Sequence, residues 1–232
     1  MRCIFNGFFF FIALQVFSQE TKLPAPLIAV DSLYREDQFY FGFSYNILLN
    51  RPPEISQNKF SSGFTGGFLR DFPVNKSRTF AVAPGIGFSY NKYFQNLVIS
   101  KSDEIAIYNQ ISPGVNYSKN KFEEILIDVP IEFRWRTSTP ESHKFWRIYS
   151  GLKLSYVLAS KSRYIDSEYN IKVTQNQDVN KFQIGTYLVW GYNTWNFYGY
   201  YGLTPLFKSS AKINNQSVGF NTLNFGLMFY IL

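Results

Sequence analysis

The sequence has one cysteine, one histidine and few charged residues, and each shortage excludes a class of protein. A single cysteine excludes a disulfide scaffold, and a single histidine excludes a metal site built from several histidines. Charged residues make up 17% of the chain, below the roughly 25% of ordinary soluble domains. A mean hydropathy of −0.14 excludes a bundle of transmembrane helices, while 46% hydrophobic residues exclude a disordered chain.

Aromatic residues and positive charge are what the chain has in excess. Phe, Tyr and Trp account for 20% of the residues, and the formal net charge is +7. Lys and Arg are nevertheless scattered, and even their densest group, Arg134 to Arg147, has Asp128 and Glu132 beside it. Because no basic stripe is present, we expect no nucleic acid among the partners.

Residues 1–18 have the pattern of a secretory signal peptide. Arg2 supplies the positive charge, residues 4–17 form an apolar stretch, and Ser18 precedes the return of polarity. The alternative, a retained anchor helix, is disfavoured because the stretch is shorter than the roughly 18 to 20 residues that span a bilayer. Cys3 would leave with the signal. We therefore expect an exported chain with a periplasmic segment at 19–37 and one domain at 38–232.

Alternation of apolar and polar residues dominates the rest of the chain. In residues 125–136 one face is wholly apolar and the other carries Asp128, Glu132, Arg134 and Arg136. Successive side chains of a strand point to opposite sides, whereas a helix would scatter these charges around its circumference. Eight segments show this period: 39–49, 60–68, 80–90, 125–136, 146–158, 182–192, 195–203 and 223–231.

The connections and the glycines indicate whether the polar face of the strands points into the barrel or outward into water. Short links (73–77, 137–143 and 193–194) alternate with longer ones, of which 92–121 and 161–181 are the longest. This asymmetry, aromatic residues near the strand ends and glycines on the polar face favour an outer-membrane barrel over a soluble lipid-binding barrel. We predict an all-β, eight-stranded antiparallel up-and-down transmembrane β-barrel in the outer membrane of a Gram-negative bacterium, with both termini periplasmic. Outer-membrane lipids and the barrel assembly machinery are its expected partners, the latter because the chain ends in an aromatic strand.

Six charged residues should point into the lumen: Asp128, Glu132, Arg134, Arg136, Arg147 and Lys153. Because a buried charge must be paired, we expect Glu132 to pair with Arg134 and with Arg147 or Lys153. The main interpretation of this network is structural. A sharper hypothesis is a periplasmic docking turn that comprises Arg136, Pro140, His143 and Lys144, with Arg147 beside it.

Enzymatic chemistry finds little support. The one histidine, His143, falls in a short turn, where it is a poor candidate for a general base. The glycines at 85 and 87 lie in a strand and lack the rest of a phosphate-binding loop. We expect no enzyme, no catalytic or metal-binding residue and no cofactor.

Two stretches carry a more specific resemblance: LIDVPIEFRWRTSTP at 126–140, and KFWRIYSG at 144–151 followed by LSY at 154–156. They resemble the PorT (SprT) family of outer-membrane barrels from Bacteroidota. The resemblance implies a non-enzymatic part in type IX protein secretion, and in gliding adhesin delivery where present, with other secretion components as partners. Since eight strands enclose a lumen too narrow for folded cargo, we expect an accessory or assembly component. The alternative is a structural or adhesive barrel with extracellular binding loops; a solute porin is disfavoured by strand number.

Overall fold

The computed structural model describes residues 36–231, except 58, 104 and 140–143. The expected signal peptide and all but the last two residues of the expected periplasmic segment lie outside the described residues. The strands are β1 (Gln38–Leu49), β2 (Ser62–Leu69), β3 (Phe72–Pro73), β4 (Phe80–Tyr93), β5 (Leu97–Ser102), β6 (Ile105–Gln110), β7 (Lys119–Arg136), β8 (Trp146–Ile165), β9 (Asn170–Thr174), β10 (Phe182–Tyr192), β11 (Trp195–Gly202), β12 (Lys212–Ile213), β13 (Gln216–Ser217) and β14 (Asn221–Ile231). No helix within the described ranges is long and apolar enough to cross a membrane.

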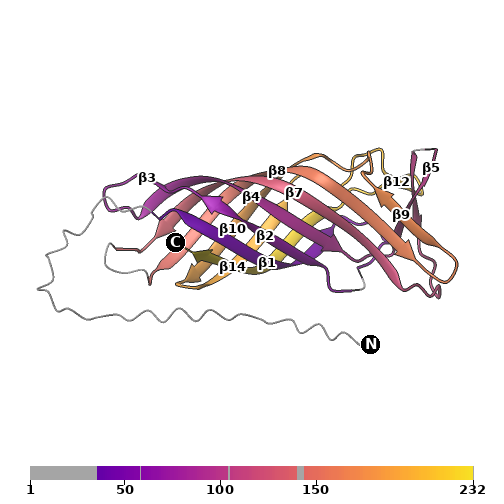
Figure 1. Ribbon diagram of the computed structural model, residues 1–232, viewed down its shortest axis with the longest axis horizontal. Coiled ribbons are helices and arrows are strands. Elements are labelled where there is room, and N and C mark those ends of the chain that lie inside the picture. The colour runs from indigo at the N-terminus through magenta and orange to yellow at the C-terminus, as the bar shows by residue number, and fades with distance from the viewer. Residues whose placement is uncertain (1–35, 58, 104, 140–143, 232) are drawn as a thin grey trace, which may run out of the picture. The chain divides into compact units, whose positions relative to one another are not determined.

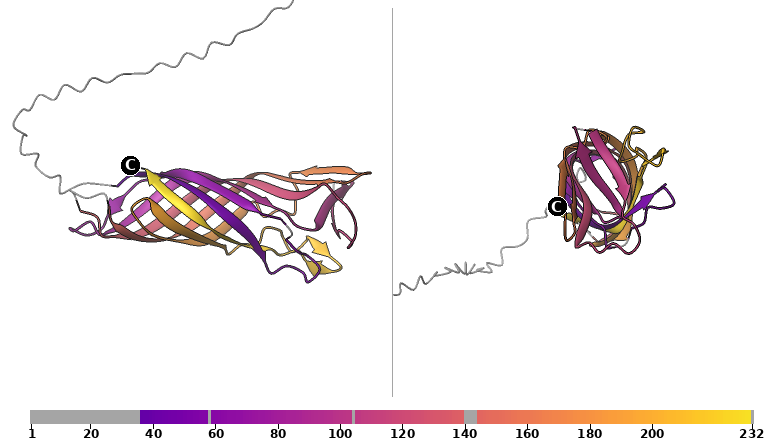
Figure 2. Two further views of the ribbon diagram at one scale, coloured as in Figure 1. Left: turned by 90° about the horizontal axis from the view of Figure 1, so that it is seen from below. Right: turned by 90° about the vertical axis from the view of Figure 1, so that its right-hand side faces the viewer.

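Eight of these strands close into a barrel. Around the ring they run β1, β2, β4, β7, β8, β10, β11 and β14, and every neighbouring pair is antiparallel. The ring closes where the first and last strands pair, with Phe39 opposite Ile231 and Leu49 opposite Asn221. Figure 2 (right) shows the strands arranged around this ring. The predicted eight-stranded up-and-down antiparallel barrel is confirmed.

The two ends of the barrel differ in construction (Figure 1). One end, called here the turn end, carries residues 70–79, 137–139, 144–145 and 193–194 together with Glu36 and Ile231. The other, the loop end, carries residues 50–57, 59–61, 94–103, 105–118, 166–181 and 203–220. The predicted loops at 92–121 and 161–181 are more ordered than expected. They contain the β5–β6 hairpin and β9, and β7 and β8 extend into them.

An apolar band covers the outside of the barrel. Along β7 the exposed side chains run from Ile125 to Trp135, every second residue, and the intervening ones are buried. Aromatic pairs lie at both margins of the band. Trp146 and Trp190 stack at 6.1 Å between ring centroids at the turn end, and Tyr156 and Phe182 approach to 5.1 Å toward the loop end. Such a band with aromatic margins is typical of a lipid-facing surface.

Glycines on the inner face make room for tyrosines from neighbouring strands. A Cβ on Gly87 would lie 2.2 Å from the hydroxyl of Tyr40, and one on Gly185 would lie 2.3 Å from the ring of Tyr200. Contacts this short are impossible, so each glycine leaves free the space that an aromatic side chain from a neighbouring strand occupies. The narrow lumen is therefore filled by interlocking rings.

The apolar face changes sides at the loop end. Between Ile125 and Leu126 the ladder with β8 shifts by one residue, so that Leu158 has no partner. Beyond this bulge the outward positions of β7 carry charge (Lys121 and Glu123), and Phe122 points inward and is buried. Seventeen buried residues form the loop-end core: Leu48, Ile55, Tyr93, Leu97, Ile99, Tyr108, Phe122, Leu126, Val157, Val173, Val179, Leu206, Phe207, Ala211, Ile213, Val218 and Phe220. The loop end thus has the polarity of a water-soluble domain, with apolar residues inside and charges outside.

Candidate functional site

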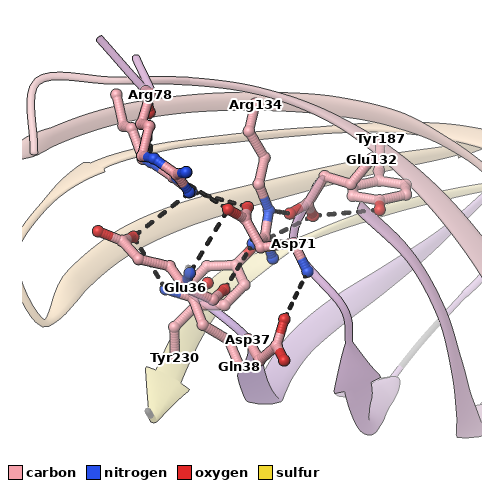
Figure 3. Close-up of polar contacts among 10 residues, drawn as sticks. Glu36, Asp37, Gln38, Asp71, Arg78, Glu132, Arg134, Tyr187 and Tyr230 are labelled. Carbon is pink, nitrogen blue, oxygen red and sulfur yellow. Dashed lines mark hydrogen bonds and ion pairs between the residues drawn. The ribbon is translucent and has the colours of Figure 1, made fainter. Parts of the chain in front are cut away.

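The lumen near the turn end contains a buried ionic cluster centred on Asp71, in the bend between β2 and β3 (Figure 3). Arg136 donates two parallel hydrogen bonds to its carboxylate, each of 2.8 Å, and Arg134 donates a third of 2.9 Å. Arg134 also bonds Glu132 through Nε at 2.8 Å. All four side chains are at most 1% exposed, so each charge is stabilised by the cluster and not by water.

The start of the described chain is part of the same cluster. The backbone carbonyl of Glu36 accepts a hydrogen bond of 3.0 Å from Arg134, and its carboxylate lies 3.6 Å from Arg136. The two tyrosine hydroxyls of Tyr187 and Tyr230 donate to Glu132 at 3.1 and 3.3 Å, as Figure 3 shows. Residues from five different parts of the chain therefore meet at this one point of the lumen.

Arg147 is held differently from the other two arginines. Its guanidinium lies over the rings of Phe145, Tyr149 and Tyr230, at 4.6, 5.6 and 5.1 Å from their centroids. Its Nε and Nη1 are buried and donate no hydrogen bond. Ring faces attract a cation through their quadrupole, and desolvation strengthens that attraction. Among the described residues, Arg147 is thus stabilised by aromatic contacts and has no carboxylate partner.

A second polar cluster lies deeper in the lumen, around Asp128 on β7. Ser155 donates a hydrogen bond of 2.6 Å to its carboxylate, Ser89 donates another, and the ammonium of Lys153 lies 3.3 Å away. Lys153 also lies 4.5 Å from the centroid of the Tyr200 ring. Asp128 and Lys153 form a buried pair whose remaining polar atoms are largely satisfied by hydroxyl groups.

The structure places the six predicted lumen residues inside the barrel but divides them among the Asp71 cluster, the Asp128 cluster and the aromatic contacts of Arg147. Glu132 pairs with Arg134 as expected, whereas Arg147 contacts aromatic rings and Lys153 pairs with Asp128. Asp71 and Glu36 are not among the residues predicted from the sequence. Each lies outside the alternating pattern, in or beside a connection, where sequence alone indicates exposure to water.

The docking-turn hypothesis needs a correction for its arginines. The side chain of Arg136 is 0% exposed and Arg147 is 5% exposed, because both point into the lumen and are engaged there. Neither guanidinium can reach a partner on the surface without breaking the barrel interior. Lys144 is exposed, while Pro140 and His143 lie outside the described residues.

The lumen is closed along its length. A space of about 10 Å³ lies inside it, room for a single water molecule. Residues from all around the ring line it: Tyr40, Thr65, Leu69, Pro130, Glu132, Lys153, Tyr187, Tyr198, Met228 and Tyr230. The ionic cluster fills the lumen at the turn end, and the loop-end core covers it at the other. In the part of the chain that the structure describes, no group of three or more His, Cys, Asp or Glu could hold a metal ion.

Comparison with known proteins fits this architecture. The model of the family described as "Outer membrane protein beta-barrel domain" matches residues 17–208, which is most of the chain. The chain belongs to this family. It is accordingly a protein of the outer membrane. Among solved structures it matches "The crystal structure of Ail, the attachment invasion locus protein of Yersinia pestis, in complex with the heparin analogue sucrose octasulfate", with 11% identity and a TM-score of 0.35 over 84% of this chain and 99% of that one. No curated protein matches.

Proposed function

We propose that this outer-membrane barrel is a non-enzymatic structural or adhesive protein, with its loop end outside the cell and both termini in the periplasm. The observation that carries the proposal is the loop-end core. Seventeen buried side chains pack β5, β6, β9 and the extended ends of β7 and β8 into a folded head beyond the apolar band. A head with its own core is a surface for contacts, because it holds its loops in fixed positions.

The head also exposes apolar side chains where a partner could cover them. On β6, Ile105 is 70% exposed and Ile107 is 41% exposed, on the same side of the hairpin. Val115 adds a third exposed apolar residue in the same connection. Apolar side chains grouped on a surface away from lipid are typical of protein contact sites. We propose that this hairpin face is the adhesive surface.

The sealed lumen favours a structural role over transport. A conduit needs a continuous polar path, whereas the lumen here is filled by paired charges and interlocking tyrosines. Opening it would separate buried ion pairs, which costs several kcal/mol for each pair.

A second candidate is an accessory component of type IX secretion, which the resemblance at 126–140 and 144–156 favours. The residues that carry this resemblance include Arg134 and Arg136, and these two arginines hold Glu36 near the end of the expected periplasmic segment. In this role the barrel would anchor a periplasmic segment for other secretion components, without conducting the cargo itself.

One deletion strain tests both candidates. We expect loss of the protein to reduce adhesion between cells or to surfaces, and we expect carboxy-terminal-signal cargo to reach the cell surface normally. Complementation should succeed with the wild type and with Val74→Ser, a control that changes an exposed apolar residue at the turn end. It should fail with Ile105→Ser/Ile107→Ser. Normal adhesion together with cargo trapped in the periplasm of an intact cell would overturn the adhesive proposal and favour the secretion candidate.

A further inference from the structure

The wall of the barrel formed by β4, β7, β8 and β9 carries a cluster of cations on its outward face. This cluster, called here the basic patch, comprises Lys92, Lys119, Lys121, Lys161, Arg163 and Lys172. The strand registers place its members side by side: Lys121 is opposite Arg163, and Arg163 is opposite Lys172. The other registered row runs from Lys92 through Glu123 to Lys161.

The position of the patch relative to the apolar band is fixed by the same registers. The row directly below it consists of Tyr90, Ile125 and Ala159, which belong to the loop-end margin of the band. The cations therefore begin within one residue pair of the lipid-facing surface. At this height a membrane presents its headgroups and no longer its acyl chains.

The patch is only weakly neutralised by the described residues. Among them Glu123 is its one carboxylate, bonded by Lys121 at 2.6 Å and by the hydroxyl of Tyr90. Nearby, Asp166 already accepts hydrogen bonds from the Tyr164 hydroxyl and from two backbone amides of its own turn.

Three cations directly opposite one another on neighbouring strands repel and destabilise a sheet. This repulsion indicates a place for an external anion with several oxygen atoms.

A groove runs along the boundary between the patch and the band. It has a volume of about 390 Å³ and lies between Tyr90 on β4 and Gln175 after β9. Ile125 and Ala159 give it an apolar side, while Lys161, Glu123 and Glu124 supply its ionisable lining. The groove and the patch together are therefore apolar toward the membrane centre and carry cations away from it.

We propose that this wall binds lipopolysaccharide, the phosphorylated and acylated glycolipid of the outer leaflet. Its phosphates would lie among the cations of the patch, where Lys and Arg supply charge-assisted hydrogen bonds. A sugar or the start of an acyl chain would occupy the groove. The assignment to this lipid rests on the proposed orientation, with the loop end outside, because lipopolysaccharide is confined to that leaflet.

The test measures binding of the purified, refolded full-length barrel in neutral detergent to lipopolysaccharide and to its dephosphorylated form. The double variant Lys161→Gln/Arg163→Gln removes two cations of the patch. The matched control, Lys76→Gln/Lys212→Gln, removes two exposed cations elsewhere. Heat-modifiable gel mobility verifies that each variant is folded.

We expect the patch variant to bind lipopolysaccharide at least tenfold more weakly than the wild type, and the control to bind within twofold. Dephosphorylation and added salt should weaken wild-type binding as well, since exposed charges are screened. Equal affinity of the patch variant and the control, or equal affinity for the dephosphorylated form, would overturn the proposal.

Orientation is measured separately in intact cells, with a membrane-impermeant maleimide and single introduced cysteines. Ser102→Cys, at the loop end, should be labelled, and Ser77→Cys, at the turn end, should not. The reverse labelling would overturn the orientation and with it the assignment to the outer leaflet, even if the patch bound lipopolysaccharide in detergent.

Discussion

Replacing Asp71 by Asn should unfold the barrel more readily than any single surface change. The Asp71 carboxylate accepts three hydrogen bonds of 2.8 to 2.9 Å from two arginines, and it is fully buried. In the variant, Arg134 and Arg136 lose one carboxylate partner, while their guanidinium groups remain buried away from water. Breaking a buried ion pair from one side costs about 3 to 5 kcal/mol, and we expect a loss of that size in the free energy of unfolding.

The assay is a urea titration of the protein in phospholipid vesicles, scored by the gel mobility of the folded barrel. Glu168→Gln removes an exposed carboxylate at the loop end, and as a control it should stay within about 0.5 kcal/mol of the wild type. If Asp71 acts through the arginines, the variant Asp71→Asn/Arg136→Gln should cost less than the two single changes together. If Asp71→Asn lowers the free energy of unfolding by less than about 1 kcal/mol, the reasoning is refuted. A buried carboxylate that accepts three hydrogen bonds from arginines cannot be removed at so small a cost.

Three further predictions concern the packing of the lumen and the head. Gly185→Val should sharply reduce the yield of folded barrel on refolding, since even a Cβ at this position would overlap the ring of Tyr200. Phe207→Ala should cost the loop-end core about 3 to 5 kcal/mol and make the head, but not the barrel, sensitive to limited proteolysis, because Phe207 packs within 5.1 to 6.0 Å of three aromatic rings. Burial raises the pKa of Tyr108 above its ordinary value of 10.0, so the folded head favours the protonated hydroxyl. Its stabilising contribution should be complete below about pH 10 and fall as the pH rises through the folded-state pKa, so the difference in proteinase K resistance between wild type and Tyr108→Phe should shrink at alkaline pH.

The barrel strands could be predicted because the sequence encodes them locally. From Ile125 to Trp135 every second residue is apolar, and this period indicates a single strand along the whole segment. The closure into eight strands followed from counting such segments. The pairing of the charges could not be predicted in the same way. Asp71 meets Arg134 and Arg136 across more than sixty residues of sequence, and only the pairing of β3 with β4 and of β4 with β7 brings the bend after β2 to the end of β7.

The loop end shows a different limit of the sequence pattern. Alternation continues through Lys121, Phe122 and Glu123, but the apolar residue now points inward. The period alone does not say which face of the strand contacts water. A strand segment whose outward side chains are charged and whose inward ones are apolar therefore resembles a connecting loop in the sequence. One unpaired residue on β8, Leu158, accompanies the change. A β-bulge of this kind depends on both strands of the ladder, so neither strand reveals it alone.

The position of this change locates the loop-end margin of the membrane on the barrel. Where lipid surrounds the wall, apolar side chains face outward, and the lumen must hold the polar ones as paired clusters such as Asp128 with Lys153. Where water surrounds the wall, the same strands are most stable with charges outside and an apolar core within. The change from one arrangement to the other occurs between Ile125 and Glu123 on β7. The basic patch begins at the same row of residues, so its cations lie at the height of the headgroups. This placement needs no assumed value for the tilt of the barrel or the thickness of the membrane.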